Sequence, residues 1–249
     1  MYQEKKVRIG VAGKGGSGKT TLAVLIIQYL LKENKKPVLA VDADPNYCLG
    51  DFLGIENFTT LMDKAEELMR LKNSLPPGID KTLLWEMGLE EILCEREGFD
   101  LLVMGKTEGP GCYCTANNLL RYLIERLAEN YPYMVMDNEA GMEHLSRRTS
   151  KDLDHLIIVA NPHPLSLKSA QRIWETAEKL EIGIKNKHLV IMETLPDSTP
   201  PATTFTPPLA TIPFDKEIER RAREGIPLLG IQEDSPAFKE TASLMEKIL

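Results

Sequence analysis

Short apolar runs alternate along the chain with longer segments in which apolar residues recur every three or four positions. The runs are continuous rather than alternating, which is typical of strands covered on both faces. Strands are expected over residues 7–13, 36–45, 99–105, 133–141, 153–162, 187–193 and 209–214. Helices are expected over residues 19–34, 115–130, 165–180 and 216–224. This order predicts an α/β fold with a mainly parallel sheet and helices on both faces.

The end of the chain is expected to belong to the same domain. Residues 236–249 have an apolar face but charges of mixed sign, which is typical of a helix docked on its own domain. Residues 195–208 are too rich in proline for a helix or a central strand, so we expect a surface loop there. We therefore expect a single domain over residues 1–249.

Composition narrows the classes of function. The length of 249 residues, the apolar fraction of 43% and the charged fraction of 27% suit one globular domain. A net charge of −7 disfavours broad binding to nucleic acid or to an anionic membrane. The longest apolar run, residues 22–31, is too short to span a bilayer, and residues 1–6 do not resemble a secretory signal. A cytoplasmic location is expected, where cysteines are more often ligands or reactive groups than disulfides.

A phosphate-binding motif lies between the first predicted strand and helix. Residues 13–21, GKGGSGKTT, fit the pattern G-x-x-x-x-G-K-[ST]. Its glycines let backbone N–H groups surround phosphate oxygens, and Lys19, Thr20 and Thr21 suit the β/γ-phosphates, Mg²⁺ and the α-phosphate. The expected nucleotide-binding residues are Gly13, Gly15, Gly16, Ser17, Gly18, Lys19, Thr20 and Thr21.

Lys14 adds a second lysine at the start of this loop. In this respect the motif resembles the deviant Walker A ATPases, a class that includes nitrogenase iron protein, septum-site and plasmid-partitioning ATPases, and metal-maturation ATPases. The resemblance implies a homodimer in which Lys14 reaches the partner's nucleotide. Hydrolysis would then proceed by positioning and charge stabilisation. The alternative is that Lys14 is a solvated loop residue.

Three aspartates follow predicted strands. Asp42 and Asp44 end the second strand, at the sheet edge where the phosphate loop also lies. The resemblance implies that Asp44 orients or activates the attacking water and that Asp42 supports it. It also implies that Asp137 holds a Mg²⁺-bound water, and that Gly141 is the switch glycine that senses the γ-phosphate. Taken singly, such aspartates are common capping residues.

Recognition of the base is less defined. Many relatives place an asparagine at the end of the penultimate strand, where this chain has Met192 and Glu193. Pro213 and Asp215, in the stretch IPFD, match a loop that flanks adenine in the class. The choice of ATP over GTP rests on this resemblance.

Cys112 and Cys114 flank a single tyrosine in the stretch GCYC. The two sulfurs of one C-x-C pair cannot complete a four-ligand site, and a disulfide between them would be strained. Two chains would together supply four thiolates, which suit Zn²⁺, Ni²⁺, Cu⁺ or an Fe–S cluster. The pair could instead be incidental loop cysteines, and Cys48 and Cys94 are expected to be core or loop thiols.

Four stretches together, GKGGSGKTT, VDADPNYCLG, GCYC and MVMDNEAGMEHLSRRT, resemble the nickel-inserting maturation ATPases of carbon monoxide dehydrogenase and acetyl-CoA synthase, the CooC and AcsF type. The resemblance covers nearly the whole chain. It implies a homodimer that binds Ni²⁺, or Zn²⁺ in its place, through Cys112 and Cys114. ATP hydrolysis would accompany delivery to carbon monoxide dehydrogenase/acetyl-CoA synthase. His144 is expected to be a packing or hydrogen-bonding residue, with a metal ligand or relay as the alternative.

Two other functions stay open. An iron-protein-like Fe–S reductase would carry a cysteine before the switch glycine, where this chain has Ala140. A MinD/ParA-like positioning ATPase would need a basic tail helix or a basic surface patch. Residues 219–224, ERRARE, are neither long nor purely basic. The sequence therefore favours the maturation ATPase.

Overall fold

The computed structural model describes residues 6–44, 46–72, 91–105, 124, 126–138, 152–179, 183–194 and 202–249. The strands are β1 (Val7–Gly13), β2 (Val38–Ala43), β3 (Leu93–Arg96), β4 (Phe99–Val103), β5 (Tyr133–Asn138), β6 (Asp152–Ala160), β7 (Gly183–Thr194) and β8 (Ala210–Pro213). The helices are α1 (Lys19–Lys32), α2 (Cys48–Leu53), α3 (Leu61–Lys72), α7 (Pro164–Lys179), α8 (Lys216–Glu224) and α9 (Pro236–Ile248).

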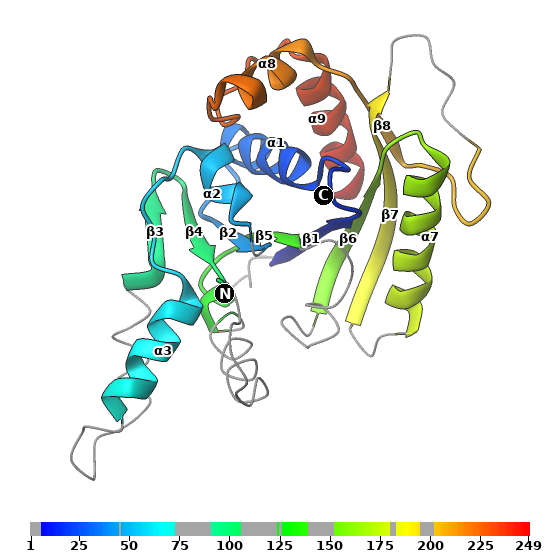
Figure 1. The fold of residues 1–249 in the computed structure, drawn as a ribbon. Helices are drawn as coiled ribbons and strands as arrows, with labels where there is room; N and C mark the ends of the chain where they lie inside the picture. Colours follow the sequence, from blue (N-terminus) through cyan, green and yellow to red (C-terminus); the bar gives the residue numbers. More distant parts are fainter. Residues whose placement is uncertain are drawn as a thin grey trace, which may run out of the picture.

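The strands form one eight-stranded sheet in the order β3-β4-β2-β5-β1-β6-β7-β8 (Figure 1). All pairs are parallel except β3 and β4, which are antiparallel. The predicted α/β class and mainly parallel sheet are confirmed. Strand β3 and helices α2 and α3 were not predicted. Strand β3 is four residues long and partly exposed, so it lacks a continuous apolar run.

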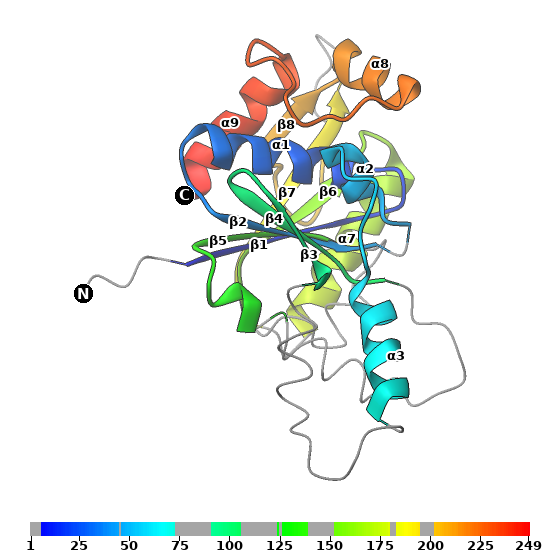
Figure 2. The same cartoon turned by 90° about the vertical axis from the view of Figure 1, so that its left-hand side faces the viewer.

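Helices cover both faces of the sheet, as Figure 2 shows. Helices α1, α8 and α9 lie on one face, and α7 lies on the other. Each face has its own buried apolar cluster; the first includes Leu22 and Phe238, and the second includes Ile173. The sheet is thus the middle of three layers, which explains why its strands are apolar on both sides.

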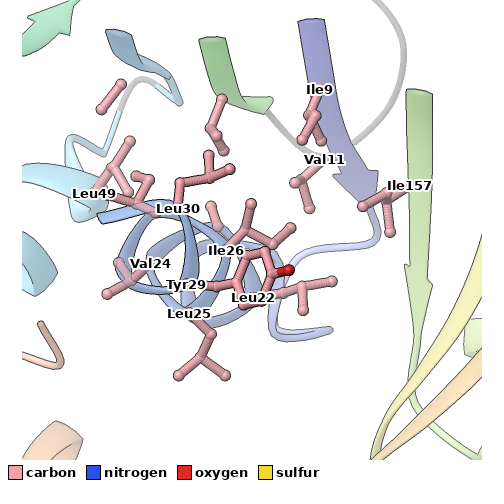
Figure 3. Packing of buried hydrophobic residues seen from close by; sticks show 14 of the residues in the cluster. Ile9, Val11, Leu22, Val24, Leu25, Ile26, Tyr29, Leu30, Leu49 and Ile157 are labelled. Carbon is pink, nitrogen blue, oxygen red and sulfur yellow. The ribbon is translucent and has the colours of Figure 1, made fainter. Parts of the chain in front are cut away.

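Helix α1 lies at the centre of the first cluster. It packs against the sheet, α2 and α9, and its residues 22–27 are fully buried. Figure 3 shows Leu22, Ile26 and Leu30 gathered near Ile9 and Val11 of β1. A helix surrounded in this way is apolar over most of its circumference. This packing holds the amino-terminal end of α1 in place at the end of β1.

The last segment is a helix docked on its own domain, as expected. In α9, Phe238, Leu244 and Met245 are buried in the first cluster. Helix α9 packs against α1 and β8. Its apolar face is therefore covered by the protein itself. Among the helices that the structure describes, none has the length and apolar character needed to cross a membrane.

A pair of histidines joins β6 to β7. His155 Nδ1 and His188 Nε2 are 3.0 Å apart, and the rings stack with centroids 5.3 Å apart. One ring must donate and the other accept, so a proton on both facing nitrogens would break the contact. Desolvation, and then the charge of His155, lower the pKa of His188 below its ordinary value of 6.5.

We expect this pair to destabilise the fold in acid. A depressed folded-state pKa means that the unfolded chain binds the proton more readily, so stability is lost as pH falls below about 6.5. The variant His188→Gln should lose less unfolding free energy than the wild type between about pH 7.5 and pH 5.5. Urea denaturation measures the difference, and the exposed His163, as His163→Gln, is the control. Equal losses in His188→Gln and wild type would show that the pair is not the cause.

Candidate nucleotide and magnesium site

The register of the sheet brings three strand ends together. Asp137 of β5 lies opposite both Val11 of β1 and Asp42 of β2. Strand β1 continues into the phosphate loop, residues 14–18, which leads into α1. Parallel strands end at the same edge, so the loop and the two aspartates meet there.

The glycines of the loop have two different roles. A Cβ atom at Gly13 would lie 2.5 Å from the carbonyl oxygen of Val159, so only glycine fits against β6. A Cβ atom at Gly15 would meet no atom of the described residues within 4 Å, so this part of the loop is open with respect to them. Gly18 has a φ of 91° and precedes α1 without a side-chain cap. The open loop and the uncapped helix end form a cradle of the kind that binds phosphate.

The two lysines of the loop differ in exposure. Lys19 is buried, and its positive charge partly offsets the rise that desolvation causes in the pKa of Asp137. Lys14 is exposed. Lys19 is thus placed inside the site of its own chain, whereas Lys14 is accessible to a second molecule.

Thr20 and Asp137 form the polar pair beneath the loop. The Thr20 hydroxyl donates to Asp137 Oδ2 over 2.6 Å. Asp137 is fully buried, and its other oxygen, Oδ1, has no hydrogen-bond partner in the described part of the chain. Desolvation raises the pKa of Asp137 to about 6, against the opposing effects of Thr20 and Lys19. A carboxylate and a hydroxyl beside a phosphate cradle fit Mg²⁺, which prefers oxygen ligands and retains bound waters.

Asp42 and Asp44 are held differently at the end of β2. The fully buried Asp42 accepts from the backbone N–H of Asp44 over 3.0 Å and from that of Leu49 over 2.9 Å. Desolvation, and then the charge of Asp137, raise the pKa of Asp42 to about 7. Asp44 is partly exposed, and its Oδ1 accepts from the backbone N–H and side-chain amide of Asn46. Asp42 therefore shapes the turn that presents Asp44 at the sheet edge.

Two residues near this edge were missed as site residues. Asn138 follows Asp137, is buried, and donates to the Val11 carbonyl oxygen over 2.9 Å. A polar residue in an otherwise apolar strand was the available signal. Cys48 lies close enough to Asp44, Asp42 and Asp137 that their charges add to desolvation in raising the pKa of its thiol.

Met192 lies against the phosphate loop. A Cβ atom at Gly18 would be 3.2 Å from Met192 Cε, and the Met192 side chain is buried. The pairing of β7 with β8 is irregular between Met192 and Thr194. This position therefore contributes packing rather than a hydrogen bond to a base.

Asp215 caps two helices. Its Oδ1 accepts from the backbone N–H groups of Glu217 and Ile218 at the start of α8. Its Oδ2 accepts from the Ser235 hydroxyl over 2.6 Å and from the backbone N–H of Ala237 over 3.4 Å. Both oxygens are engaged, so the carboxylate holds the starts of α8 and α9 together.

A cavity of about 400 Å³ opens beside this cap. Phe214, Ile231 and Pro236 give it apolar surface, and Gln232 and Glu217 line it with polar groups. Apolar walls with a few polar groups are typical of small-molecule sites, and the volume suits an aromatic base. Pro213 precedes Phe214 at the end of β8.

Several predicted site residues lie outside the part of the chain that the structure describes. They are Cys112, Cys114, Gly141 and His144. Their placement stays a prediction. Within the described ranges, no group of three or more histidine, cysteine, aspartate or glutamate side chains could hold a metal ion.

Residues 9–243 match the family model of the CobQ/CobB/MinD/ParA nucleotide binding domain. The chain belongs to this family. An uncharacterized ATP-binding protein of Methanocaldococcus jannaschii is 38% identical over 97% of this chain and 98% of its own length. The carbon monoxide dehydrogenase accessory protein CooC of Rhodospirillum rubrum is 30% identical over 98% of this chain and 96% of its own length.

Solved structures of the family share the fold. A ParA family ATPase from Chlorobium tepidum superposes with a TM-score of 0.70 and 21% identity, over 97% of this chain and 98% of that one. A chain of the MinC:MinD cell division protein complex from Aquifex aeolicus superposes with a TM-score of 0.70 and 21% identity, over 97% of this chain and 95% of that one. At this level of identity the likeness establishes the fold of this CobQ/CobB/MinD/ParA family member.

The two roles of glycine in the loop can be separated by experiment. Gly13→Ala should lower the unfolding free energy by about 1–3 kcal/mol, because its Cβ atom would overlap the Val159 carbonyl oxygen. Gly15→Ala should change it by less than about 0.5 kcal/mol. It should instead weaken ATP binding roughly tenfold, because the methyl group enters the phosphate cradle. Urea denaturation and titration with fluorescent nucleotide distinguish the two, and a reversed pattern would contradict this assignment.

Proposed function

We propose that this protein is a homodimeric, Mg²⁺-dependent ATPase that delivers nickel to carbon monoxide dehydrogenase/acetyl-CoA synthase in the cytoplasm. The observation that carries the nucleotide part is the hydrogen bond between Thr20 and Asp137 beneath an open phosphate loop. That arrangement pairs a magnesium-binding hydroxyl with a buried carboxylate beside the phosphate cradle.

Each site residue at the sheet edge beside the phosphate loop has a proposed role in hydrolysis. Loop N–H groups and Lys19 bind the phosphates, and Thr20 with Asp137 holds Mg²⁺, which would neutralise negative charge on the phosphate oxygens. Asp44, the partly exposed carboxylate, orients the attacking water, while Asp42 supports the turn that carries it. A carboxylate can position water in this way without being a strong base.

The proposed base site is the cavity beside α8 and α9. Phe214, Ile231 and Pro236 suit contact with the faces of adenine, and Gln232 carries an amide that can both donate and accept. Asp215 lines this cavity and caps both helices, and Pro213 ends β8 directly before Phe214, which also lines it.

The nickel part of the proposal rests on two supports. The relative CooC is named as a carbon monoxide dehydrogenase accessory protein, and it aligns with nearly the whole chain. This chain also carries the pair Cys112 and Cys114, and two chains would bring four thiolates together. Zn²⁺ would fit the same ligands. Because the nucleotide would lie at the same dimer interface, ATP binding and metal affinity would be coupled.

A positioning ATPase is the second candidate, favoured by the ParA and MinD structures that share the fold. In that class, membrane attachment would use a basic amphipathic tail helix. Here the apolar side chains of α9 are packed against α1 and β8. The Fe–S reductase remains the third alternative, and a visible chromophore in anaerobically purified protein would favour it.

The cross-subunit role of Lys14 has a clear expected outcome. Lys14→Ala should bind ATP with nearly wild-type affinity, because the buried Lys19 stays in place for the phosphates and the exposed Lys14 is proposed to act on the partner's nucleotide. Its turnover should fall at least about a hundredfold, the usual cost of removing one charge-stabilising group. Steady-state ATPase assays and nucleotide titration measure the two. Wild-type turnover would contradict action in trans.

The metal site is tested by replacing Cys112 and Cys114 with serine. The wild type should bind about one Ni²⁺ or Zn²⁺ per dimer, because four thiolates from two chains form one site. The double variant should lose the metal and keep ATP binding, as measured by native mass spectrometry with and without ATP. The double variant Cys48→Ser/Cys94→Ser is the matched control. Stoichiometric metal in the Cys112/Cys114 variant would refute the assignment.

A further inference from the structure

Asn138 is a buried polar residue next to the proposed magnesium ligand. It ends β5 directly after Asp137 and is only 1% exposed. Side chains alternate along a strand, so Asp137 faces α1 and Thr20 while Asn138 faces the opposite side of the sheet. There its amide nitrogen would be 3.5 Å from a Cβ atom at Gly10, so the glycine leaves room for it.

The surroundings determine the orientation of this amide. Asn138 Nδ2 lies 2.9 Å from the Val11 carbonyl oxygen and 3.4 Å from that of Met136. A flipped amide would place its oxygen against two other acceptors, so the nitrogen must face the carbonyls. Val11 is the residue opposite Asp137 in the pairing of β1 with β5. The hydrogen bond therefore joins the two strand ends that carry the phosphate loop and Asp137.

The oxygen of the Asn138 amide, Oδ1, lowers the stability of the fold. Asn138 Oδ1 is buried and has no hydrogen-bond partner among the residues that the structure describes, a condition that costs free energy. Within the described ranges, the other buried side-chain atoms of this kind are Ser17 Oγ and Asp137 Oδ1. All three belong to the phosphate loop or the end of β5. An apolar side chain of similar shape would avoid this cost at Asn138, so the asparagine is better explained by its hydrogen bond to β1.

We propose that Asn138 is a positioning residue for the magnesium–nucleotide site. It clamps the end of β5 to β1 from the face opposite the site, and so keeps Asp137 directed at Thr20. Groups that orient a metal ligand commonly affect metal affinity about 10- to 100-fold without contacting the metal. The inference rests on the proposed ATP and Mg²⁺ binding, and it does not depend on nickel.

The test separates magnesium coupling from folding. The affinity for fluorescent ADP is measured with Mg²⁺ and with EDTA, for the wild type, Asn138→Leu and Asn138→Ser. Both variants should bind ADP in EDTA as tightly as the wild type does. The factor by which Mg²⁺ increases the ADP affinity should be about tenfold smaller in the variants than in the wild type. Asn138→Ser serves as the test variant if the Asn138→Leu protein does not fold. The control is Asn186→Ala, which removes a similar amide hydrogen bond, 3.1 Å to the Asp154 carbonyl oxygen, between β7 and β6.

Each outcome decides the matter. If the Mg²⁺-dependent gain is unchanged in both Asn138 variants, the positioning role is wrong. If affinities in EDTA and in Mg²⁺ fall together with the melting temperature, Asn138 is a structural residue only. If Asn186→Ala loses the same gain, the effect is general to the sheet and the proposal is overturned. If the wild type binds no nucleotide, the proposed function itself is wrong. That result differs from the first outcome, in which the variants bind nucleotide and keep the full gain in affinity that Mg²⁺ provides.

Discussion

The hydrogen bond between Thr20 and Asp137 joins residues that are 117 positions apart in the sequence. It depends on β5 lying beside β1 in parallel, with Asp137 opposite Val11. A shift of one residue in that register would turn Asp137 to the other face of the sheet, away from α1. The buried contacts of α1 and the bond from Asn138 to Val11 both hold this register. The geometry of the site is therefore a consequence of sheet pairing.

The same register buries two carboxylates side by side. Asp42 and Asp137 are opposite each other on β2 and β5, and both are fully buried. Desolvation raises the pKa of each, and the charge of Asp137 adds to the rise at Asp42. A divalent cation at this edge would favour the ionised carboxylates. Metal binding and the stability of this edge are thus expected to depend on each other.

The proposed function has two parts, one concerned with the nucleotide and one with the metal, and they have different support. The nucleotide layer is supported by the geometry of β1, β5 and α1 together with membership of the CobQ/CobB/MinD/ParA family. The metal layer is supported by the relative CooC and by Cys112 and Cys114, which lie outside the described residues. Helix α9 packs its apolar side chains against α1 and β8, in the same buried cluster that holds α1 in place.

Local sequence patterns determined the α/β class, the buried strands, helix α1 and the phosphate loop, because each depends on neighbouring residues. They did not predict β3, which is short and partly exposed, or α2 and α3. Only the tertiary structure showed Met192 packed against Gly18, Asp215 capping two helices and Asn138 bonded to Val11. These contacts join segments far apart in the sequence, so they are decided by strand register and helix packing.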